Sequence, residues 1–401
     1  MAVLRRILGR LAAVLVSGCL AALALELYLR LASPADEGYR VWPPHLQATF
    51  HPQPEIMPGV EGPSHFRVNA RGLRGAEAPD AGGAPVHRVL CVGGSTTECL
   101  YLDQEESWPG LLQILLISGL SAELSAGSED LAVHVENAGV SGRTTRDHVV
   151  MLRRLLPELG PFDRVILLAG VNDLMLPLTR QADYDPRFLE QPGAEAELLP
   201  RAFAVLPWRH RPELPWTKRT ELWRRFAPPL KRLLGVGSFQ DSKGEVVVQW
   251  RRHRRAAARL RDELPDLTAA LDEYRRNLIT LIELCEPTGA RVLVVTQPCL
   301  WRDDLPPELV DACWMGGVGD YQNAPGAEYY SIPALARGMQ LYNDVALDVA
   351  RERGLDVLDL VPLVPRDGTS FYDDVHFTEN GARIVAEAIA EVLLAAPPLG
   401  G

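Results

Sequence analysis

The chain has 401 residues, of which 47% are hydrophobic and 23% are charged. These fractions are typical of a folded globular protein with a sizeable core and exclude an intrinsically disordered chain. The formal net charge of −11 argues against a general nucleic-acid-binding protein, because such proteins carry an excess of basic residues. No nucleic acid is therefore expected among its partners.

Residues 1–32 are predicted to form a membrane-spanning signal anchor. Three arginines precede an uncharged apolar run over residues 11–25, and the apolar character continues to residue 32. These arginines are Arg5, Arg6 and Arg10. The whole stretch suffices to cross a bilayer, which takes about 20 residues, and Glu26 and Arg30 are spaced to pair on one helix face. Basic residues before the run predict a cytoplasmic N-terminus, so we expect a single-pass protein of the inner (cytoplasmic) membrane with its remainder in the periplasm.

Two other interpretations of this segment remain open. The first is a cleaved signal peptide, although the sequence has no clear small-residue cleavage site followed by polar residues. The second is a lipoprotein signal with a lipidated Cys19, because Val16-Ser17-Gly18-Cys19 resembles a lipobox. Residues 20–25 stay apolar, whereas a mature lipoprotein usually begins with polar sequence. The uncleaved anchor is therefore favoured.

An alternation of β-type runs and helical patterns follows a lead-in and linker over residues 33–85, which are rich in proline, glycine and polar residues. Strands are predicted at 89–92, 133–140, 165–169, 292–296 and 357–360. Helices are predicted at 108–120, 148–159, 271–286, 340–353 and 382–395. Short apolar strands separated by helices indicate a parallel sheet that is buried on both faces. Residues 86–396 are therefore predicted to form one doubly wound α/β domain with a five-stranded parallel sheet.

Residues 177–265 interrupt this alternation with many prolines, several tryptophans and clustered arginines. We interpret them as an insertion at the mouth of the sheet. The densest basic cluster is Arg251-Arg252-His253-Arg254-Arg255. It is expected to be a solvent-exposed helix face, with contact to anionic headgroups or an acidic polymer as the alternative.

The six cysteines form no CxxC pair, so the sequence carries no zinc-ribbon or CxxC redox motif. They are Cys19, Cys91, Cys99, Cys285, Cys299 and Cys313. Cys91 lies in an apolar run and is expected to be a small core residue. A disulfide among the others remains open.

Residues with catalytic chemistry follow four of the predicted strands. Ser95 follows the first strand, Gly142 the second and Asn172 the third. Residues 371–377, which follow the fifth strand, contain His376 with acidic residues before it. Ligands bind beyond the carboxyl ends of the strands in an open parallel sheet. We therefore expect these four segments to meet at one edge of the sheet.

These residue types are the ones that acyl transfer needs. The hydroxyl of Ser95 becomes an effective nucleophile when a neighbouring base, here His376, accepts its proton. A carboxylate behind the imidazole fixes its tautomer and stabilises the imidazolium. The candidate donors for the oxyanion of the tetrahedral intermediate are the backbone N–H groups of Ser95 and Gly142 and the side-chain amide of Asn172. A phosphate loop at residues 93–97 is a competing interpretation, but the segment lacks the lysine of a P-loop.

The four segments together resemble the SGNH hydrolases, or GDSL esterase/lipase superfamily, whose four blocks are named for Ser, Gly, Asn and His. Ser95 in Gly-Gly-Ser-Thr-Thr is similar to the first block. Gly142 in Asn-Ala-Gly-Val-Ser-Gly-Arg-Thr-Thr is similar to the second, and Asn172 in Gly-Val-Asn-Asp to the third. Asp373 and His376 resemble the Asp-x-x-His block.

This resemblance spans residues 86–396 and implies a flavodoxin-like three-layer α/β/α fold and a reaction without a cofactor. No metal site is predicted either. The resemblance assigns Asp373, three residues before His376, to the catalytic triad and leaves Asp374 outside it. Gly94 departs from the eponymous motif, which has an Asp there, but that Asp is not a triad member. The anchor and lead-in are similar to a bacterial subgroup with one N-terminal transmembrane helix.

We therefore expect a serine hydrolase of carboxylic esters that acts on a small-molecule or glycan ester. Removal of acetyl groups from an envelope glycan and cleavage of a lipid ester both fit this prediction. An O-acyltransferase acting on a polysaccharide and a catalytically idle scaffold that binds glycan or protein are the alternatives. His148 is expected to be an ordinary helix residue.

The rim of the site is expected to come from the insertion and from a loop over residues 299–335. The aromatic residues of this loop are Trp301, Trp314, Tyr321, Tyr329 and Tyr330. They suit a sugar ring or an acyl chain, or simply pack the loop.

Overall fold

The computed structural model describes residues 2–32, 38–80, 82, 86–124, 132–207, 220–223 and 242–395. The chain divides into two compact units, Met1–Tyr39 with Leu206–Phe239 and Arg40–Val205 with Gln240–Gly401. Residues 33–37 of the predicted lead-in, and residues 208–219 and 224–241 of the predicted insertion, lie outside the described residues. The boundaries predicted for the anchor, the lead-in and the catalytic domain stay predictions.

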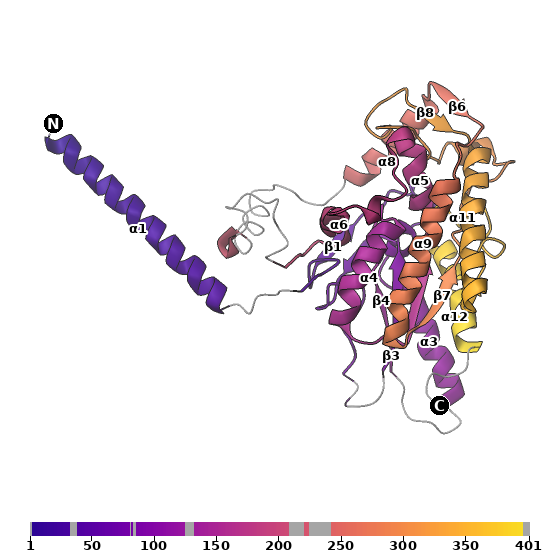
Figure 1. Ribbon diagram of the computed structural model, residues 1–401, viewed down its shortest axis with the longest axis horizontal. Helices are drawn as coiled ribbons and strands as arrows, with labels where there is room; N and C mark the ends of the chain where they lie inside the picture. The colour runs from indigo at the N-terminus through magenta and orange to yellow at the C-terminus, as the bar shows by residue number, and fades with distance from the viewer. Residues whose placement is uncertain are drawn as a thin grey trace. The chain divides into compact units, whose positions relative to one another are not determined.

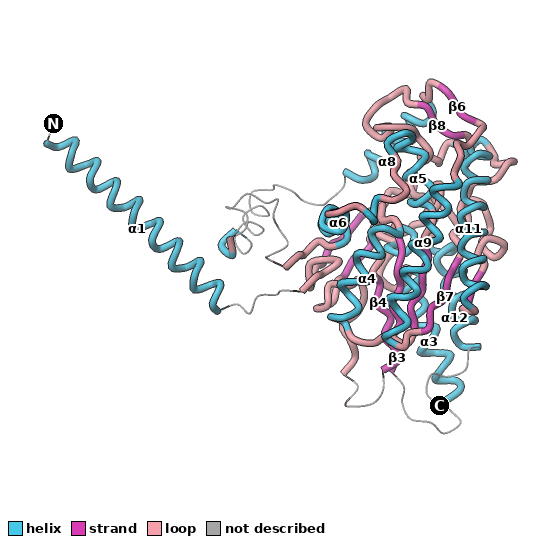
Figure 2. The backbone as a smooth tube through the Cα atoms, in the orientation of Figure 1, coloured by secondary structure: helices cyan, strands magenta, loops and turns pink. Residues whose placement is uncertain are grey.

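A five-stranded parallel sheet runs through the larger unit (Figure 2). Its strands are β3 (Val86–Gly93), β4 (Ala132–Asn137), β5 (Arg164–Leu168), β7 (Arg291–Val295) and β9 (Asp356–Leu358). They lie in the order β4-β3-β5-β7-β9, and every neighbouring pair is parallel. This order, in which the second strand lies outside the first, is that of flavodoxin-like folds. The predicted fold class is thus confirmed.

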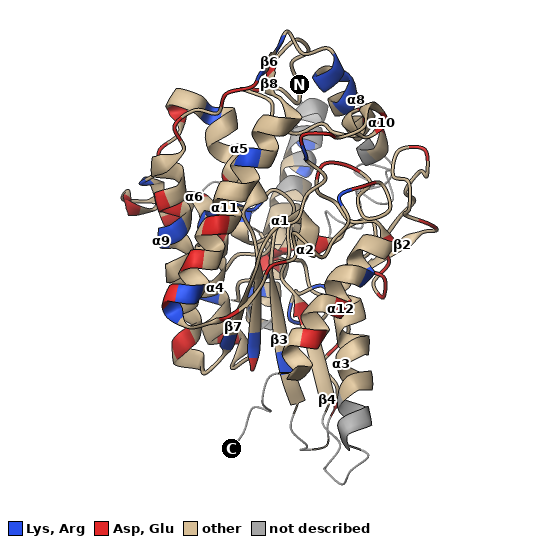
Figure 3. Ribbon diagram, turned by 90° about the vertical axis from the view of Figure 1, so that its right-hand side faces the viewer, with Lys and Arg blue, Asp and Glu red and all other residues tan. Residues whose placement is uncertain are grey.

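Helices cover both faces of the sheet. They are α3 (Trp108–Leu124), α4 (Thr145–Leu159), α9 (Thr268–Cys285), α11 (Ile332–Arg353) and α12 (Glu379–Ala395). Helix α3 packs against α12, while α9 packs against both α4 and α11. Figure 3 shows these two groups on either side of the strands, which explains why residues 89–92 of β3 are buried.

Four of these helices, α4, α9, α11 and α12, begin earlier than their apolar periodicity predicts. Polar caps account for the early starts of α4 and α11. The backbone N–H and the hydroxyl of Thr144 both donate to the carboxylate of Asp147, at 2.9 and 3.0 Å, in a capping box at the start of α4. The Ser331 hydroxyl accepts a hydrogen bond from the N–H of Ala334 at the start of α11. Periodicity reports only the buried stripe of a helix, so it misses such polar first turns.

The smaller elements connect the sheet and build the region around its carboxyl edge. The helices are α2 (Ser95–Glu98), α5 (Val171–Arg180), α6 (Ala194–Ala202), α8 (Ser242–Arg255) and α10 (Pro307–Val310). The 3₁₀ turns are η1 (Gln181–Asp183), η2 (Phe188–Glu190) and η5 (Glu286–Thr288). The strands β6 (Arg259–Arg261) and β8 (Glu328–Tyr330) form a separate parallel pair.

The later part of the lead-in belongs to the same unit as the sheet. Its strands β1 (Gln47–Phe50) and β2 (Ser64–Arg67) form an antiparallel pair. Beyond them, the fully buried guanidinium of Arg74 donates to the carbonyls of Cys99 and Leu102, each at 2.8 Å. A buried cation is tolerated here because backbone acceptors replace its water. These hydrogen bonds connect the lead-in to the segment that follows Ser95.

The N-terminal helix α1 (Ala2–Ala32) is long and apolar enough to cross a membrane (Figure 1). The candidate span is Ala12–Leu31, with a mean hydropathy of 2.0. The Arg30 guanidinium donates to the Glu26 carboxylate at 2.6 Å, as their spacing predicts. A signal sequence has the same length and composition. These two properties are therefore shared by a retained membrane span and a cleaved signal sequence, and they do not set the orientation of the helix across a membrane.

Candidate active site

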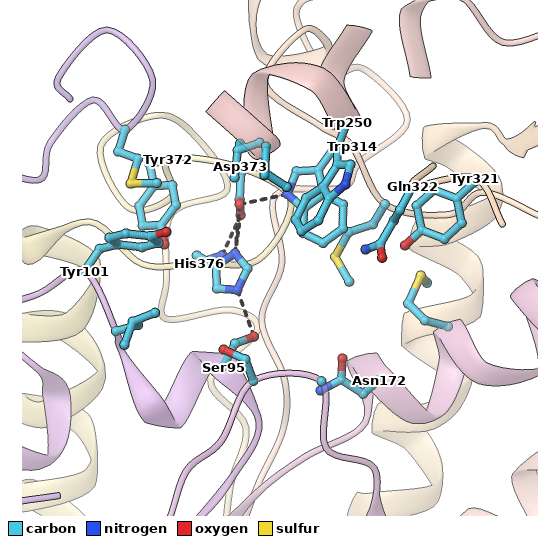
Figure 4. A pocket seen from close by; sticks show the side chains of 18 residues that line it. Ser95, Tyr101, Asn172, Trp250, Trp314, Tyr321, Gln322, Tyr372, Asp373 and His376 are labelled. Atoms are coloured by element: carbon cyan, nitrogen blue, oxygen red, sulfur yellow. Dashed lines mark hydrogen bonds and ion pairs between the residues drawn. The ribbon is translucent and has the colours of Figure 1, made fainter. Parts of the chain in front are cut away.

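Segments that lie 281 residues apart in the chain bring a hydroxyl, an imidazole and a carboxylate into one series (Figure 4). Ser95 lies at the start of α2, immediately beyond the carboxyl end of β3. Its Oγ lies 2.8 Å from Nε2 of His376, and Nδ1 of His376 lies 2.8 Å from each carboxylate oxygen of Asp373. The ring of His376 also stacks on that of Tyr372, with a 5.6 Å centroid separation and an 11° angle between the planes. The imidazole is therefore held both along its edge and on one face.

The carboxylate of Asp373 is surrounded by hydrogen-bond donors. Its Oδ1 accepts the backbone N–H groups of Val375 and His376 at 3.1 and 3.0 Å, and its Oδ2 accepts the indole N–H of Trp314 at 3.0 Å. Burial raises the pKa of Asp373, but the charge and hydrogen bonds of His376, with the Trp314 bond, outweigh it and lower the pKa to about 2. Asp373 is therefore ionised throughout the pH range in which His376 gains or loses its proton.

The pKa of His376 is shifted in the opposite direction. Burial lowers it, but the charge and hydrogen bond of Asp373 raise it, with smaller contributions from Asp374 and Glu98, and it ends above its ordinary value. This arrangement stabilises an imidazolium beside Ser95. It suits a histidine that takes up a proton during a reaction and then returns it.

The adjacent carboxylate, Asp374, points to different partners. It accepts the indole N–H of Trp301 at 2.8 Å and the backbone N–H groups of Trp314 and Met315 at 2.7 and 3.2 Å. Burial and the charge of Asp373 raise the pKa of Asp374. Asp374 therefore anchors the 299–335 loop, and sequence reasoning identified neither this role nor the bond between Trp314 and Asp373.

Hydrogen bonds connect the turn that contains Gly142 to the segment that contains Ser95. Glu98, on α2, accepts the backbone N–H of Ser141 at 2.7 Å and also the Ser141 hydroxyl. Gly142 has a φ of +74°, which glycine adopts without strain, and it lines the same cavity as Ser95. The second predicted segment thus reaches the site.

Asn172 also lines the cavity, on the first turn of α5. One hydrogen of its amide donates to the carbonyl of Arg143 at 2.9 Å, which leaves the other available to a ligand. A Cβ at Gly94 would come within 2.6 Å of this amide nitrogen. The glycine that departs from the eponymous motif therefore makes room for Asn172.

The cavity beside Ser95 has a volume of about 440 Å³. Of the five aromatic residues predicted at the rim, Trp314 and Tyr321 line it, whereas Trp301, Tyr329 and Tyr330 are buried in the surrounding packing. The remaining wall includes residues that the sequence did not single out. They are Met57, Leu100, Tyr101, Met175, Val246, Val247, Trp250, Met315, Gln322 and Tyr372. The general predictions that the insertion and the 299–335 loop contribute to the rim pointed toward the regions of Val246, Val247, Trp250, Met315 and Gln322.

The basic cluster on α8, blue in Figure 3, corrects the expectation of a fully solvated face. Arg252 and Arg255 are exposed, but Arg251 and Arg254 are buried. Arg251 donates to the carbonyls of Ile56, Ala312 and Tyr372 at 2.8, 2.8 and 3.0 Å. Arg254 donates to the carbonyls of Met315 and Tyr330. These two side chains bind the surrounding loops together and do not present charge to a solvent-borne polyanion.

His148 and the cysteines do not line the cavity. His148 is buried in α4, and burial lowers its pKa to about 4. All six cysteines have free thiols, and Cys91 is fully buried in β3. Within the described part of the chain, no group of three or more His, Cys, Asp or Glu residues is arranged to hold a metal ion.

Comparisons with known proteins place the chain in a family. The model of the GDSL-like Lipase/Acylhydrolase family matches residues 91–384, a stretch that contains all five predicted site residues. No match is found among curated protein sequences.

Several solved structures are similar. LAE5, an alpha/beta hydrolase enzyme from the metagenome of Lake Arreo, is 15% identical over 77% of this chain and 95% of its own, with a TM-score of 0.39. Axe2, an acetylxylan esterase from Geobacillus stearothermophilus, is 15% identical over 78% and 96%, with a TM-score of 0.39. A lipolytic protein of the G-D-S-L family from Veillonella parvula is 13% identical over 77% and 99%, with a TM-score of 0.38.

Proposed function

Because the chain belongs to the GDSL-like lipase/acylhydrolase family and is therefore an ester hydrolase, we propose that Ser95, His376 and Asp373 are its catalytic triad. The observation that carries this proposal is the unbroken series of 2.8 Å contacts from the Ser95 hydroxyl through His376 to Asp373. It joins a nucleophile, a base and the group that orients the base, which is the arrangement that nucleophilic ester cleavage requires.

The reaction proceeds in two acyl transfers. Oγ of Ser95 attacks the ester carbonyl while Nε2 of His376 takes its proton. The tetrahedral intermediate then collapses, the bond to the alcohol oxygen breaks, and the imidazolium gives its proton to the departing alcohol. In the second half, His376 takes a proton from water as the water attacks the acyl-enzyme, and then returns it to Ser95 as the carboxylic acid leaves. Asp373 stays ionised throughout and holds Nδ1 protonated.

The oxyanion hole comprises the backbone N–H groups of Ser95 and Gly142 and the side-chain amide of Asn172. The positive φ of Gly142 and the spare amide hydrogen of Asn172 support this assignment, as does the position of both residues on the cavity wall. Removing one donor of this kind costs a factor of about 10²–10³ in kcat. Replacing Asn172 by Ala is therefore expected to lower kcat far more than it raises KM.

Labelling with a fluorophosphonate probe tests the triad. The wild-type protein is expected to react covalently at Ser95, whereas a Ser95→Ala variant with an unchanged melting temperature is expected to stay unlabelled. Hydrolysis of p-nitrophenyl acetate should be lost in parallel. Equal labelling of both proteins would assign the nucleophile elsewhere, and a folded wild-type protein that never labels would favour a non-catalytic scaffold.

The apolar helix α1 and the arginines before its span support a membrane-anchored enzyme with its catalytic unit on the periplasmic side. Protease digestion of intact spheroplasts tests this orientation. The catalytic unit is expected to be cleaved without lysis, and its protection until lysis would reverse the topology.

A further inference from the structure

One side of the active-site cavity is a chamber with mostly apolar walls, here called the α8 chamber. Its apolar wall residues are Met175, Val246, Val247, Trp250, Trp314 and Met315, and the polar side chains of Tyr321 and Gln322 lie on the same side. Figure 4 shows Trp250 and Trp314 on the side of Ser95 toward Asn172, while Tyr101 and Tyr372 lie on the other side of His376. We propose that the α8 chamber binds the acyl chain of the substrate, and that this chain is longer than an acetyl group. The proposal rests on the function proposed above.

The chemistry of the walls favours methylene groups over sugar hydroxyls. Valine and methionine side chains offer no strong hydrogen-bond partner, so a hydroxyl enclosed against them would lose its water without replacement. The rings of Trp250 and Trp314 lie against each other, with centroids 4.5 Å apart and planes at 35°. Their mutual contact covers part of one face of each ring and so reduces the ring surface that a stacked sugar could use.

The two buried arginines of α8 do not line this chamber. Arg251 and Arg254 use their guanidinium groups on backbone carbonyls of the surrounding loops. Among the described residues that line the cavity, the ionisable ones apart from tyrosines are Asp373 and His376, which belong to the proposed triad. This described wall therefore offers no lysine or arginine to bind an anionic headgroup, and its recognition of a ligand depends mainly on apolar contact.

The size of the cavity exceeds what a small acyl group would fill. Its volume of about 440 Å³ falls in the range of roughly 300–1,000 Å³ that encloses drug-sized ligands. An acetyl group on Ser95 would leave the far wall untouched. A longer chain would contact more of the wall that includes Val246, Trp250 and Met175, and each buried methylene would add to binding in the transition state.

The experiment compares two ester series on the full-length protein in lipid nanodiscs. The first series varies the acyl group from acetate through butanoate to octanoate on p-nitrophenol, and the second varies the alcohol on a constant acetate. In the first series, kcat/KM is expected to rise by up to about fourfold for each methylene. The second series is expected to stay flat. A flat or falling first series, or a rise confined to the second, would overturn the proposal.

A matched pair of variants locates the effect. Val246→Trp fills the chamber and is expected to lower the octanoate-to-acetate ratio of kcat/KM at least about tenfold. Gln249→Trp adds the same side chain to an exposed position of α8 outside the cavity and should leave the ratio unchanged. An unchanged ratio in Val246→Trp, with normal melting, would place the acyl chain elsewhere.

Two more substrates distinguish a membrane lipid from a free ester as the source of the acyl chain. One is a medium-chain lysophospholipid and the other is ethyl octanoate, which is not a membrane lipid. Cleavage of either supports the proposal and identifies the source. Cleavage of neither, while p-nitrophenyl acetate is still hydrolysed, would overturn the proposal and leave the triad standing. Acetate hydrolysis that persists in Ser95→Ala would instead refute the proposed function itself.

Discussion

The two neighbouring carboxylates at 373 and 374 offer a sharp test of the proposed triad, because replacing each by asparagine should have opposite consequences. In Asp373→Asn, the one remaining oxygen is held by the backbone N–H groups of Val375 and His376. The new amide NH₂ then takes the place of Oδ2, where it faces Nδ1 of His376 and the indole N–H of Trp314. An NH₂ group facing Nδ1 favours the tautomer that carries its proton on Nε2.

That tautomer cannot accept the proton of Ser95. The expected loss in kcat is about 10⁴, or about 5 kcal/mol of transition-state stabilisation. The unpaired indole N–H of Trp314 should also cost about 1–3 kcal/mol of unfolding free energy. In the wild type, kcat/KM should rise with pH through the pKa of His376, above the ordinary value for histidine, because only the neutral imidazole is a base. This limb should move to lower pH in Asp373→Asn, because the carboxylate that raises the pKa is gone.

The control, Asp374→Asn, should lose stability and keep its chemistry. Its carboxylate accepts three N–H donors, from Trp301, Trp314 and Met315, and a single amide oxygen cannot serve them all. Its melting temperature should fall, while kcat measured well below that temperature stays near the wild-type value. Stopped assays with p-nitrophenyl butanoate and differential scanning calorimetry provide both readouts. A folded Asp373→Asn protein within about tenfold of wild-type kcat would refute the assignment of Asp373.

Two further predictions concern buried charge outside the triad. Arg251→Ala should lower the unfolding free energy by at least about 2 kcal/mol in urea denaturation, because three backbone carbonyls lose their donor. The exposed neighbour supplies the control Arg252→Ala, and equal losses in both would contradict the buried role of Arg251. Burial raises the pKa of Asp173 to about 7, so ionisation of this carboxyl is less favourable in the folded protein than in the unfolded chain. The unfolding free energy should therefore fall as pH rises from the ordinary carboxyl pKa through 7. Asp173→Asn should therefore gain stability over the wild type from about pH 4 to pH 8, and a pH-independent difference would contradict this.

The sequence by itself determined the α/β class, the five strands and the segments that meet at the carboxyl edge of the sheet. Continuous apolar runs are visible because a parallel strand is buried on both faces. The residues proposed for catalysis follow these runs directly, so Ser95 and Asn172 were found from their places at strand ends. The choice of Asp373 over Asp374 came from a family resemblance, and its partner Trp314 came only from the structure.

Tertiary structure decided the features that depend on contacts distant in the chain. Arg74 and Arg251 look like solvated cations in sequence, yet both are buried because backbone carbonyls from separate segments replace their water. The apolar wall formed by Met175 and Val246 is likewise invisible locally, since neither residue lies near Ser95 in sequence. The hydrophobic pattern of the sequence shows which face of a helix or strand is buried. Which other element packs against that face depends on how the whole chain folds.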